Sequence, residues 1–241
     1  VFIGTIGAGK TTAICHLFNL VGKFDKQEEL GKKIVTIKNK NESLLTTGSG
    51  RTTISEVIIK QSNKTYIQID PYPRDIVESY IGDFCVSLYR DNKKEGDMMI
   101  ETELERAIRS FTDLKNITVK GKTVDLAKEQ ASKLSFEELK RIAIENSNLD
   151  MRNYNKEDSI LNCPPDKDEK VWLKENFDKV NRGEEKTFSI PRKIYVYASA
   201  AILGGSEMTL FDSVIDTKGI GENSIRTDLS SYIESEDTIC L

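Results

Sequence analysis

GTIGAGKT, residues 4–11, has the pattern G-x-x-x-x-G-K-[ST] and directly follows the apolar run Val1-Phe2-Ile3. Residues 12–18 have the composition of a helix. A strand, a glycine-rich loop and a helix in this order are the context that a phosphate-binding loop needs. The glycines let the loop turn tightly with its N–H groups toward an anion, and the helix N-terminus adds positive potential there. We therefore expect this segment to bind a nucleoside triphosphate.

Two side chains of this segment have specific expected roles. The Lys10 ammonium should reach the terminal phosphates, and the Thr11 hydroxyl should hold Mg²⁺. The alternative is a glycine-rich turn in which Lys-Thr occurs by chance, which the flanking strand and helix disfavour. The candidate nucleotide-binding residues here are Gly4, Gly7, Ala8, Gly9, Lys10, Thr11 and Thr12.

A second candidate motif, VIDTKG at 214–219, is an apolar strand that ends in D-x-x-G. The strand should bring Asp216 to the edge of the sheet where ligands bind in open α/β folds. There its carboxylate can hold Mg²⁺ through water, and the Gly219 N–H can approach the γ-phosphate closely. The alternative is an ordinary acidic turn after a strand.

A first switch segment should supply a threonine to Mg²⁺ and to the γ-phosphate. Thr52 and Thr53 are the candidates because they follow the Gly-Ser-Gly of 48–50 and precede a strand, and Thr46 and Thr47 are alternatives. Arg51 beside them is a candidate for neutralising charge during phosphoryl transfer, against the alternative of a solvated loop residue.

The D-T-x-G form at Asp216 resembles the second switch of the translation-factor-like GTPases, which include Ras-like and dynamin-like proteins. With the phosphate loop, switch threonines and D-T-x-G in this order, the chain resembles the bacterial dynamin-like large GTPases. The resemblance implies a P-loop three-layer αβα sheet and Mg²⁺-dependent hydrolysis of GTP to GDP. It also implies switch loops that control assembly or partner binding, and a homodimer through the nucleotide face. Ile220 stands where Ras-like proteins have a water-orienting glutamine, so we expect slow hydrolysis by the chain alone.

Two other functions stay open. One alternative is an ATPase with an atypical second motif. The other is a nucleotide-gated scaffold that binds nucleotide and scarcely hydrolyses it. The guanine-reading motif N/T-K-x-D is expected just after a strand at 238–241, where the sequence stops. We therefore expect both ends to be cuts through a longer protein, with a membrane surface or protein partner bound through the missing regions.

Hydrophobic periodicity divides the chain. Residues 1–73 and 191–241 are expected to form the nucleotide-binding domain, with 74–190 as a helical insertion or lobe. In the first part we expect a strand at 33–38 and a hairpin of 54–59 with 65–69. In the lobe, helical stripes lie around 76–88, 100–111 and 171–180, and Ser135 and Glu138 form a capping box for another helix. Strands are expected again at 193–197 and 209–215.

Composition limits the remaining classes. The chain has 241 residues and a net charge of −4, with 38% hydrophobic and 31% charged residues. Residues 1–70 carry 10 Lys and Arg against 6 Asp and Glu, so the acidic excess lies in the remainder and nucleic acid is not the expected partner. Four scattered cysteines without C-x-x-C spacing predict reduced thiols in a cytoplasmic protein. A single histidine excludes a metal site built from several histidines of this chain.

Overall fold

The fold combines helices with a mixed β-sheet, so the expected α/β class is confirmed at this level. The structure is a computed structural model, and it describes residues 1–5, 8–30, 33–45, 55–89, 102–119, 122–204, 208, 210–218 and 229–241.

The chain forms two compact units. Unit 1 comprises Val1–Gln68, Ile160–Asp178 and Lys193–Leu241, and unit 2 comprises Ile69–Ser159 and Lys179–Arg192. The lobe expected at 74–190 included 160–178, whereas these residues pack with unit 1. The reason is visible in the pairing of residues 160–162, which add a strand to the sheet of that unit.

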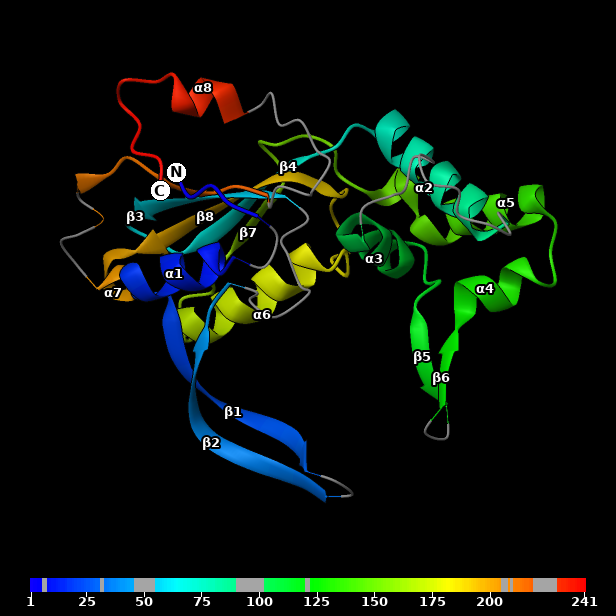
Figure 1. The fold of residues 1–241 in the computed structure, drawn as a ribbon, viewed down its shortest axis with the longest axis horizontal. Coiled ribbons are helices and arrows are strands. Elements are labelled where there is room, and N and C mark those ends of the chain that lie inside the picture. The colour runs from blue at the N-terminus through cyan, green and yellow to red at the C-terminus, as the bar shows by residue number, and fades with distance from the viewer. Residues whose placement is uncertain are drawn as a thin grey trace. The chain divides into compact units, whose positions relative to one another are not determined.

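The elements follow one another in this order: α1 (Lys10–Leu17), β1 (Val21–Leu30), β2 (Lys33–Ser43), β3 (Glu56–Ser62), β4 (Tyr66–Pro71), α2 (Arg74–Leu88), α3 (Thr102–Phe111), β5 (Asn116–Val119), β6 (Lys122–Asp125), α4 (Leu126–Ala131), α5 (Phe136–Ser147), η1 (Leu149–Met151), β7 (Ile160–Asn162), α6 (Glu169–Asn181), β8 (Pro191–Ser199), α7 (Ala200–Leu203), β9 (Val214–Asp216) and α8 (Ser230–Ile233). Figure 1 labels most of them.

The main sheet has the strand order β7-β4-β8-β3-β9. β3 runs parallel to β8 and antiparallel to β9, and β4 is antiparallel to β7. The predicted hairpin of 54–59 with 65–69 is therefore wrong, because β8 lies between β3 and β4. The turn after Ser62 lacks the Asn-Gly or Gly-X pair that favours a tight hairpin, and β8 is an apolar strand suited to a central place.

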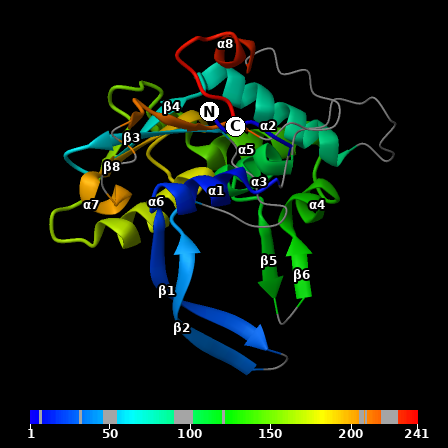
Figure 2. The ribbon, with the colours of Figure 1, turned by 60° about the vertical axis from the view of Figure 1, so that its left-hand side comes forward.

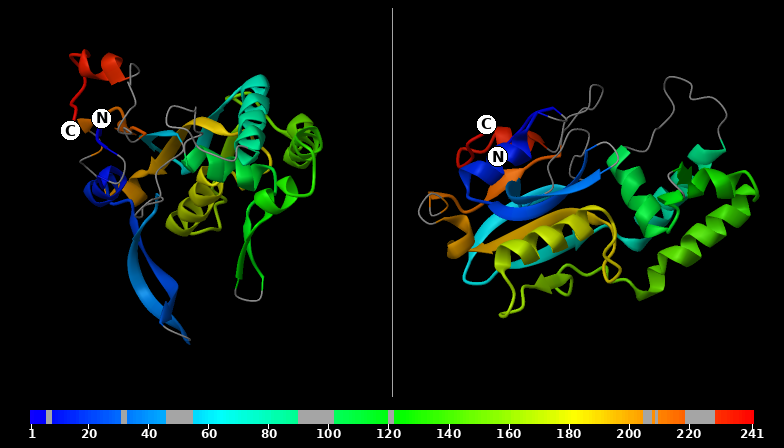
Figure 3. Two further views of the ribbon diagram at one scale, coloured as in Figure 1. Left: turned by 45° about the vertical axis from the view of Figure 1, so that its right-hand side comes forward. Right: turned by 90° about the horizontal axis from the view of Figure 1, so that it is seen from below.

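One face of this sheet forms the core of unit 1. Alternate residues of β3 and β8 are fully buried there, among them Val57, Ile59, Ile194 and Val196. Figures 1 and 2 show α1 and α6 on the same side of the sheet, and Figure 3 (right) shows α6 lying across it. Burial of Phe177 on α6 contributes to this layer, at about 25 cal/mol per Å² of apolar surface removed from water.

The first residues of the chain extend this sheet beyond β9. Phe2 pairs in parallel with Asp216, and its N–H donates to Ile215 O at 2.8 Å. On the other side, Leu241 N–H donates to Val1 O at 2.9 Å and Leu241 O accepts from Ile3 N–H at 2.8 Å. The segment 238–241 thus pairs with the chain start without forming the regular strand expected. The strand expected at 209–215 is shorter and begins at Val214.

β1 and β2 form a long antiparallel hairpin that extends away from the main sheet of unit 1 (Figure 2). The sequence predicted a strand at 33–38, which β2 confirms, but not β1. Between the pairs Phe24–Lys40 and Lys26–Ile37 the register shifts, with one residue of β1 opposite two of β2. Asn39 has φ of 54° there, and its N–H donates to the Asp25 carboxylate at 3.0 Å. This bulge bends the hairpin, because an extra residue increases local twist.

Unit 2 contains α2 and α3, where the sequence predicted helices at 76–88 and 100–111, and residues 100 and 101 lie outside the described part of the chain. The predicted capping box is confirmed: Ser135 accepts from the Glu138 N–H, and the Glu138 carboxylate accepts from the Ser135 N–H. α2 and α5 present buried residues including Ile81, Phe84 and Leu139. A small hairpin of β5 and β6 completes the unit. The helix predicted at 171–180 is α6, which belongs mostly to unit 1.

Candidate functional site

The phosphate-loop segment leads into α1 through a glycine in the left-handed region. Gly9, the N-cap of α1, has φ of 83°. A side chain is strained in this conformation even though nothing lies within 4 Å of a Cβ built there. Ala13 N–H donates the first helical hydrogen bond to Gly9 O at 2.9 Å. The N–H groups of Lys10, Thr11 and Thr12 precede that bond and lie at the positive end of the helix.

The Lys10 side chain folds back over the loop. Its Nζ donates to Gly4 O at 2.9 Å and to Thr5 O at 3.1 Å. A Cβ at Gly4 would lie 3.6 Å from Lys10 Cδ, so the glycine leaves the lysine stem ordinary contact distance. The Lys10 ammonium is thereby held at the carbonyls of the first two residues of the phosphate-loop segment.

Asp216 and Thr11 come together from positions 205 residues apart. The Thr11 hydroxyl donates a hydrogen bond to Asp216 Oδ2. Asp216 ends β9, and the pairing of Phe2 with Asp216 places the start of the phosphate loop beside it. The sheet thereby joins the two sequence motifs at one edge.

The other carboxylate oxygen of Asp216 is the distinctive feature of this edge. Asp216 is 1% exposed, and its Oδ1 accepts no hydrogen bond from any residue that the structure describes. Burial raises the pKa of Asp216, while the hydrogen bond from Thr11 and the charge of Lys10 act in the opposite direction. A buried carboxylate oxygen without a partner is costly unless a cation or a water completes it. The hydroxyl of Thr11 and the carboxylate of Asp216 are hard oxygen ligands, so the residues present fit Mg²⁺.

Thr217 has a structural role that the sequence did not indicate. Its N–H and its hydroxyl both donate to Phe2 O, at 3.3 and 2.8 Å, and the residue is 1% exposed. This double contact holds the end of β9 against Phe2, two residues before the phosphate-loop segment. Thr217 therefore helps to keep Asp216 paired with Phe2.

Several predicted site residues lie outside the described part of the chain. They are Gly7 of the phosphate loop, Arg51, Thr52 and Thr53 with the alternatives Thr46 and Thr47, and Gly219 after β9. The described chain reaches this gap from buried positions, since Leu44, Leu45 and Ser55 are all nearly inaccessible. The roles of the threonines, Arg51 and Gly219 stay predictions.

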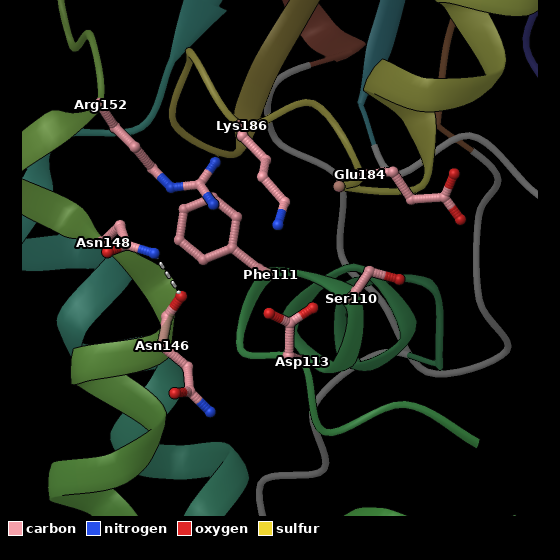
Figure 4. Close-up of a pocket in the computed structure, with 9 residues that line it drawn as sticks. Ser110, Phe111, Asp113, Asn146, Asn148, Arg152, Glu184 and Lys186 are labelled. Carbon is pink, nitrogen blue, oxygen red and sulfur yellow. Dashed lines mark hydrogen bonds between the residues drawn. The ribbon is translucent and has the colours of Figure 1, made fainter. Parts of the chain in front are cut away.

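A second place with charged side chains lies within unit 2. A cavity of about 30 Å³ is lined by Ser110, Phe111, Asp113, Asn146, Asn148, Arg152, Gly183, Glu184 and Lys186. Figure 4 shows the Arg152 guanidinium over the Phe111 ring, with Lys186 and Asp113 extending toward the cavity from opposite sides.

Arg152 makes three hydrogen bonds within its own unit. Its Nε donates to Ser147 O at 2.6 Å, and its Nη1 donates to Glu185 O and Phe188 O at 2.9 Å. Its Cζ lies 3.5 Å from the centre of the Phe111 ring. Burial lowers the pKa of the guanidinium to about 10, so it remains charged at neutral pH. The group binds the last carbonyl of α5 and two carbonyls of a neighbouring loop, which is a structural role.

Sequence reasoning missed Arg152 and also two lysines of α6, Lys170 and Lys174, that contact the base of the β1–β2 hairpin. No local pattern distinguishes these residues from the other charged side chains of the chain. Their partners are backbone carbonyls from distant segments, so only the folded chain identifies them.

Among the described residues, no three or more His, Cys, Asp or Glu side chains gather in a group that could hold a metal ion. Within the same residues, no helix has the length and apolar character required to cross a membrane. No protein-family model and no curated protein sequence matches this chain.

Proposed function

We propose that unit 1 is a P-loop domain that binds GTP with Mg²⁺ and hydrolyses it to GDP. The observation that carries the proposal is the junction of Thr11 with Asp216, whose second oxygen is buried without a described partner. Two motifs that are each compatible with chance meet at one edge of the sheet, beside a lysine and a helix N-terminus. That convergence favours a nucleotide site over two unrelated turns.

In this proposal each described residue has a physical task. Lys10 releases its contacts with loop carbonyls to bind the β- and γ-phosphates, and the first N–H groups of α1 bind phosphate oxygens. Thr11 and Asp216 hold Mg²⁺, directly and through its water shell. When bound, the ion neutralises charge on the phosphates. Thr53 or Thr52, Arg51 and Gly219 would complete the site from segments outside the described residues.

Guanine specificity rests on the D-T-x-G form of the second motif alone, so an ATPase is the second candidate. A scaffold that binds nucleotide with little turnover is the third. We place the protein in the cytoplasm. We also propose that a homodimer through the nucleotide face, or another partner, completes the catalytic site, because Ile220 stands where Ras-like proteins have a water-orienting glutamine.

The test is a titration of the purified chain with fluorescent GTP and ATP analogues, with and without Mg²⁺. We expect guanine-nucleotide binding that Mg²⁺ strengthens and that Lys10→Ala removes, with phosphate release measured on the same samples. Equal or tighter ATP binding would favour the ATPase. Tight GTP binding with no phosphate release would favour the scaffold, and no binding of either nucleotide would refute the proposal.

A further inference from the structure

We propose that Lys170 and Lys174 of α6 form a clamp on the base of the β1–β2 hairpin, and that this clamp positions the phosphate-loop helix α1. Both lysines are positioning residues, since they act through the hairpin. The consequence for nucleotide affinity rests on the proposed function, whereas the effect on α1 itself does not.

The clamp holds both strands of the hairpin where they leave the body of unit 1. Lys170 Nζ donates to Val21 O, at the first residue of β1, at 2.9 Å, and lies 3.5 Å from Asn19 O. Lys174 Nζ donates to Ser43 O, at the last residue of β2, at 3.1 Å. The two lysines are four residues apart, so they project from the same face of α6.

The Lys174 contact is partly shielded from water. Its Nζ lies 3.1 Å from Glu42 Oε2, and the two side chains are 24% and 21% exposed. The ammonium also lies 5.2 Å from the centre of the Phe24 ring. That ring packs tightly on Gly22, where a Cβ would lie 2.6 Å from a ring carbon. An ion pair combined with a cation–π contact at a half-buried site is stronger than an exposed surface pair.

The hairpin base in turn contacts α1. α1 packs against β2, and Cys15 on α1 is fully buried. Leu44 N–H donates to Leu20 O at 2.8 Å, and Leu44 and Leu45 are fully buried. Ser43, the residue that Lys174 holds, is thus the last residue of the strand that packs against α1.

α1 depends on such contacts for its position. It has eight residues, and a helix of this length is unstable in water without tertiary packing. Its N-terminal turn carries Lys10 and Thr11, so a shift at Cys15 moves both side chains relative to Asp216. Misplacement of a binding group by a fraction of an ångström weakens the interaction it makes.

The first experiment measures amide hydrogen exchange of the nucleotide-free chain. In Lys174→Ala we expect exchange about tenfold faster in both the hairpin and α1, since local opening controls exchange. Lys174→Arg should restore most of the protection, because a guanidinium can reach Glu42 and Ser43 O. Lys179→Ala, at an exposed lysine of the same helix, is the matched control and should leave both regions unchanged. If exchange in α1 is unchanged in Lys174→Ala, the proposal is overturned.

The second experiment measures nucleotide affinity of the same variants. Lys174→Ala should bind GTP and GDP about tenfold more weakly, at temperatures well below its unfolding, with Lys174→Arg close to wild type. If Lys174→Ala folds poorly, Glu42→Gln replaces it, because this variant removes the ion pair and keeps the contacts with Ser43 and Phe24. Wild-type affinity in a variant whose α1 exchanges faster would refute the link to the site. A wild type that binds no nucleotide would instead refute the proposed function, and the exchange result would still decide whether the clamp positions α1.

Discussion

Two buried charges, one in each unit, differ in how they are compensated. Arg152 in unit 2 is 7% exposed and donates to three backbone carbonyls while stacking on Phe111. Asp216 in unit 1 is 1% exposed, accepts one hydrogen bond from Thr11, and has an oxygen without a partner among the described residues. The first charge makes three hydrogen bonds within the fold. One oxygen of the second charge has no partner among the described residues.

The difference separates a structural charge from a candidate binding charge. Both groups carry the cost of desolvation, and a folded chain tolerates that cost where it gains hydrogen bonds or where function requires the group. The cavity beside Arg152 is lined by several charged side chains, yet its arginine already donates to three backbone carbonyls. The edge beside Asp216 has no such compensation, and it is where two sequence motifs converge. Compensation of the charge, more than the presence of a hollow, identifies the candidate site.

The largest expected effect comes from removing the Arg152 side chain. Arg152→Ala leaves the carbonyls of Ser147, Glu185 and Phe188 without their donor and opens space over Phe111. We expect the free energy of unfolding to fall by about 3–5 kcal/mol, as for removal of one partner from a buried charged network. Chemical denaturation monitored by circular dichroism measures this. Nucleotide affinity of the folded fraction should stay at the wild-type value, and an affinity loss comparable to that of a phosphate-loop variant would break the comparison.

The next largest effect comes from removing the Lys10 side chain at the candidate nucleotide site. Lys10→Ala removes contacts to two loop carbonyls, so the unfolding free energy should change by less than about 1 kcal/mol. Guanine-nucleotide affinity should fall about 100-fold, since charge-assisted contacts to phosphate are strong. Fluorescence titration gives the affinity, and Lys179→Ala is the control. Weak destabilisation with strong loss of binding is the opposite of the pattern expected for Arg152→Ala.

Two glycines with positive φ sharpen the contrast further. Gly183 in unit 2 has φ of 66°, and a Cβ there would lie 2.8 Å from Ala107 O. Gly9 at the phosphate loop has φ of 83° and open space around the added atom. Gly183→Ala should cost about 2–3 kcal/mol of stability from strain plus overlap, and Gly9→Ala about 1 kcal/mol from backbone strain alone. Thermal unfolding of the two variants measures the difference, and equal losses would contradict this account.

The smallest effect is a gain of stability. Burial raises the pKa of the Asp216 carboxyl above its ordinary value, so at a pH between the two values the folded state binds more protons than the unfolded state. The ionised form therefore costs stability as the pH rises through the folded pKa. Asp216→Asn should stabilise the nucleotide-free chain by about 1 kcal/mol at neutral pH and by almost nothing near pH 3. Urea unfolding at both pH values tests this.

Asp216→Asn should also weaken the Mg²⁺ dependence of nucleotide binding, because the amide removes the negative charge. A variant that is less stable than wild type at neutral pH would show that the carboxylate is compensated in the apo protein. That result would remove the distinction drawn between Asp216 and Arg152.

Much of the local structure could be predicted from the sequence. The helix after the phosphate loop, the helix at 76–88 and the capping box of Ser135 with Glu138 all formed as expected, because short-range periodicity and capping determine them. The hairpin of 54–59 with 65–69 was wrong because β8, more than 120 residues later, separates the two strands. The grouping of 160–178 with unit 1 was missed for a related reason: a strand of three residues has no reliable signal.

The sequence by itself determined the candidate chemistry, since a G-K-T loop before a helix and an aspartate at a strand end need only local residues to be recognised. Only the tertiary structure shows that Thr11 bonds directly to Asp216, that the second oxygen of Asp216 is buried, and that Lys170 and Lys174 contact the hairpin base. Those relations depend on hydrogen bonds and burial between residues up to 205 positions apart. Such contacts arise from the way strands add to a common sheet, and local sequence carries no record of which strands will become neighbours.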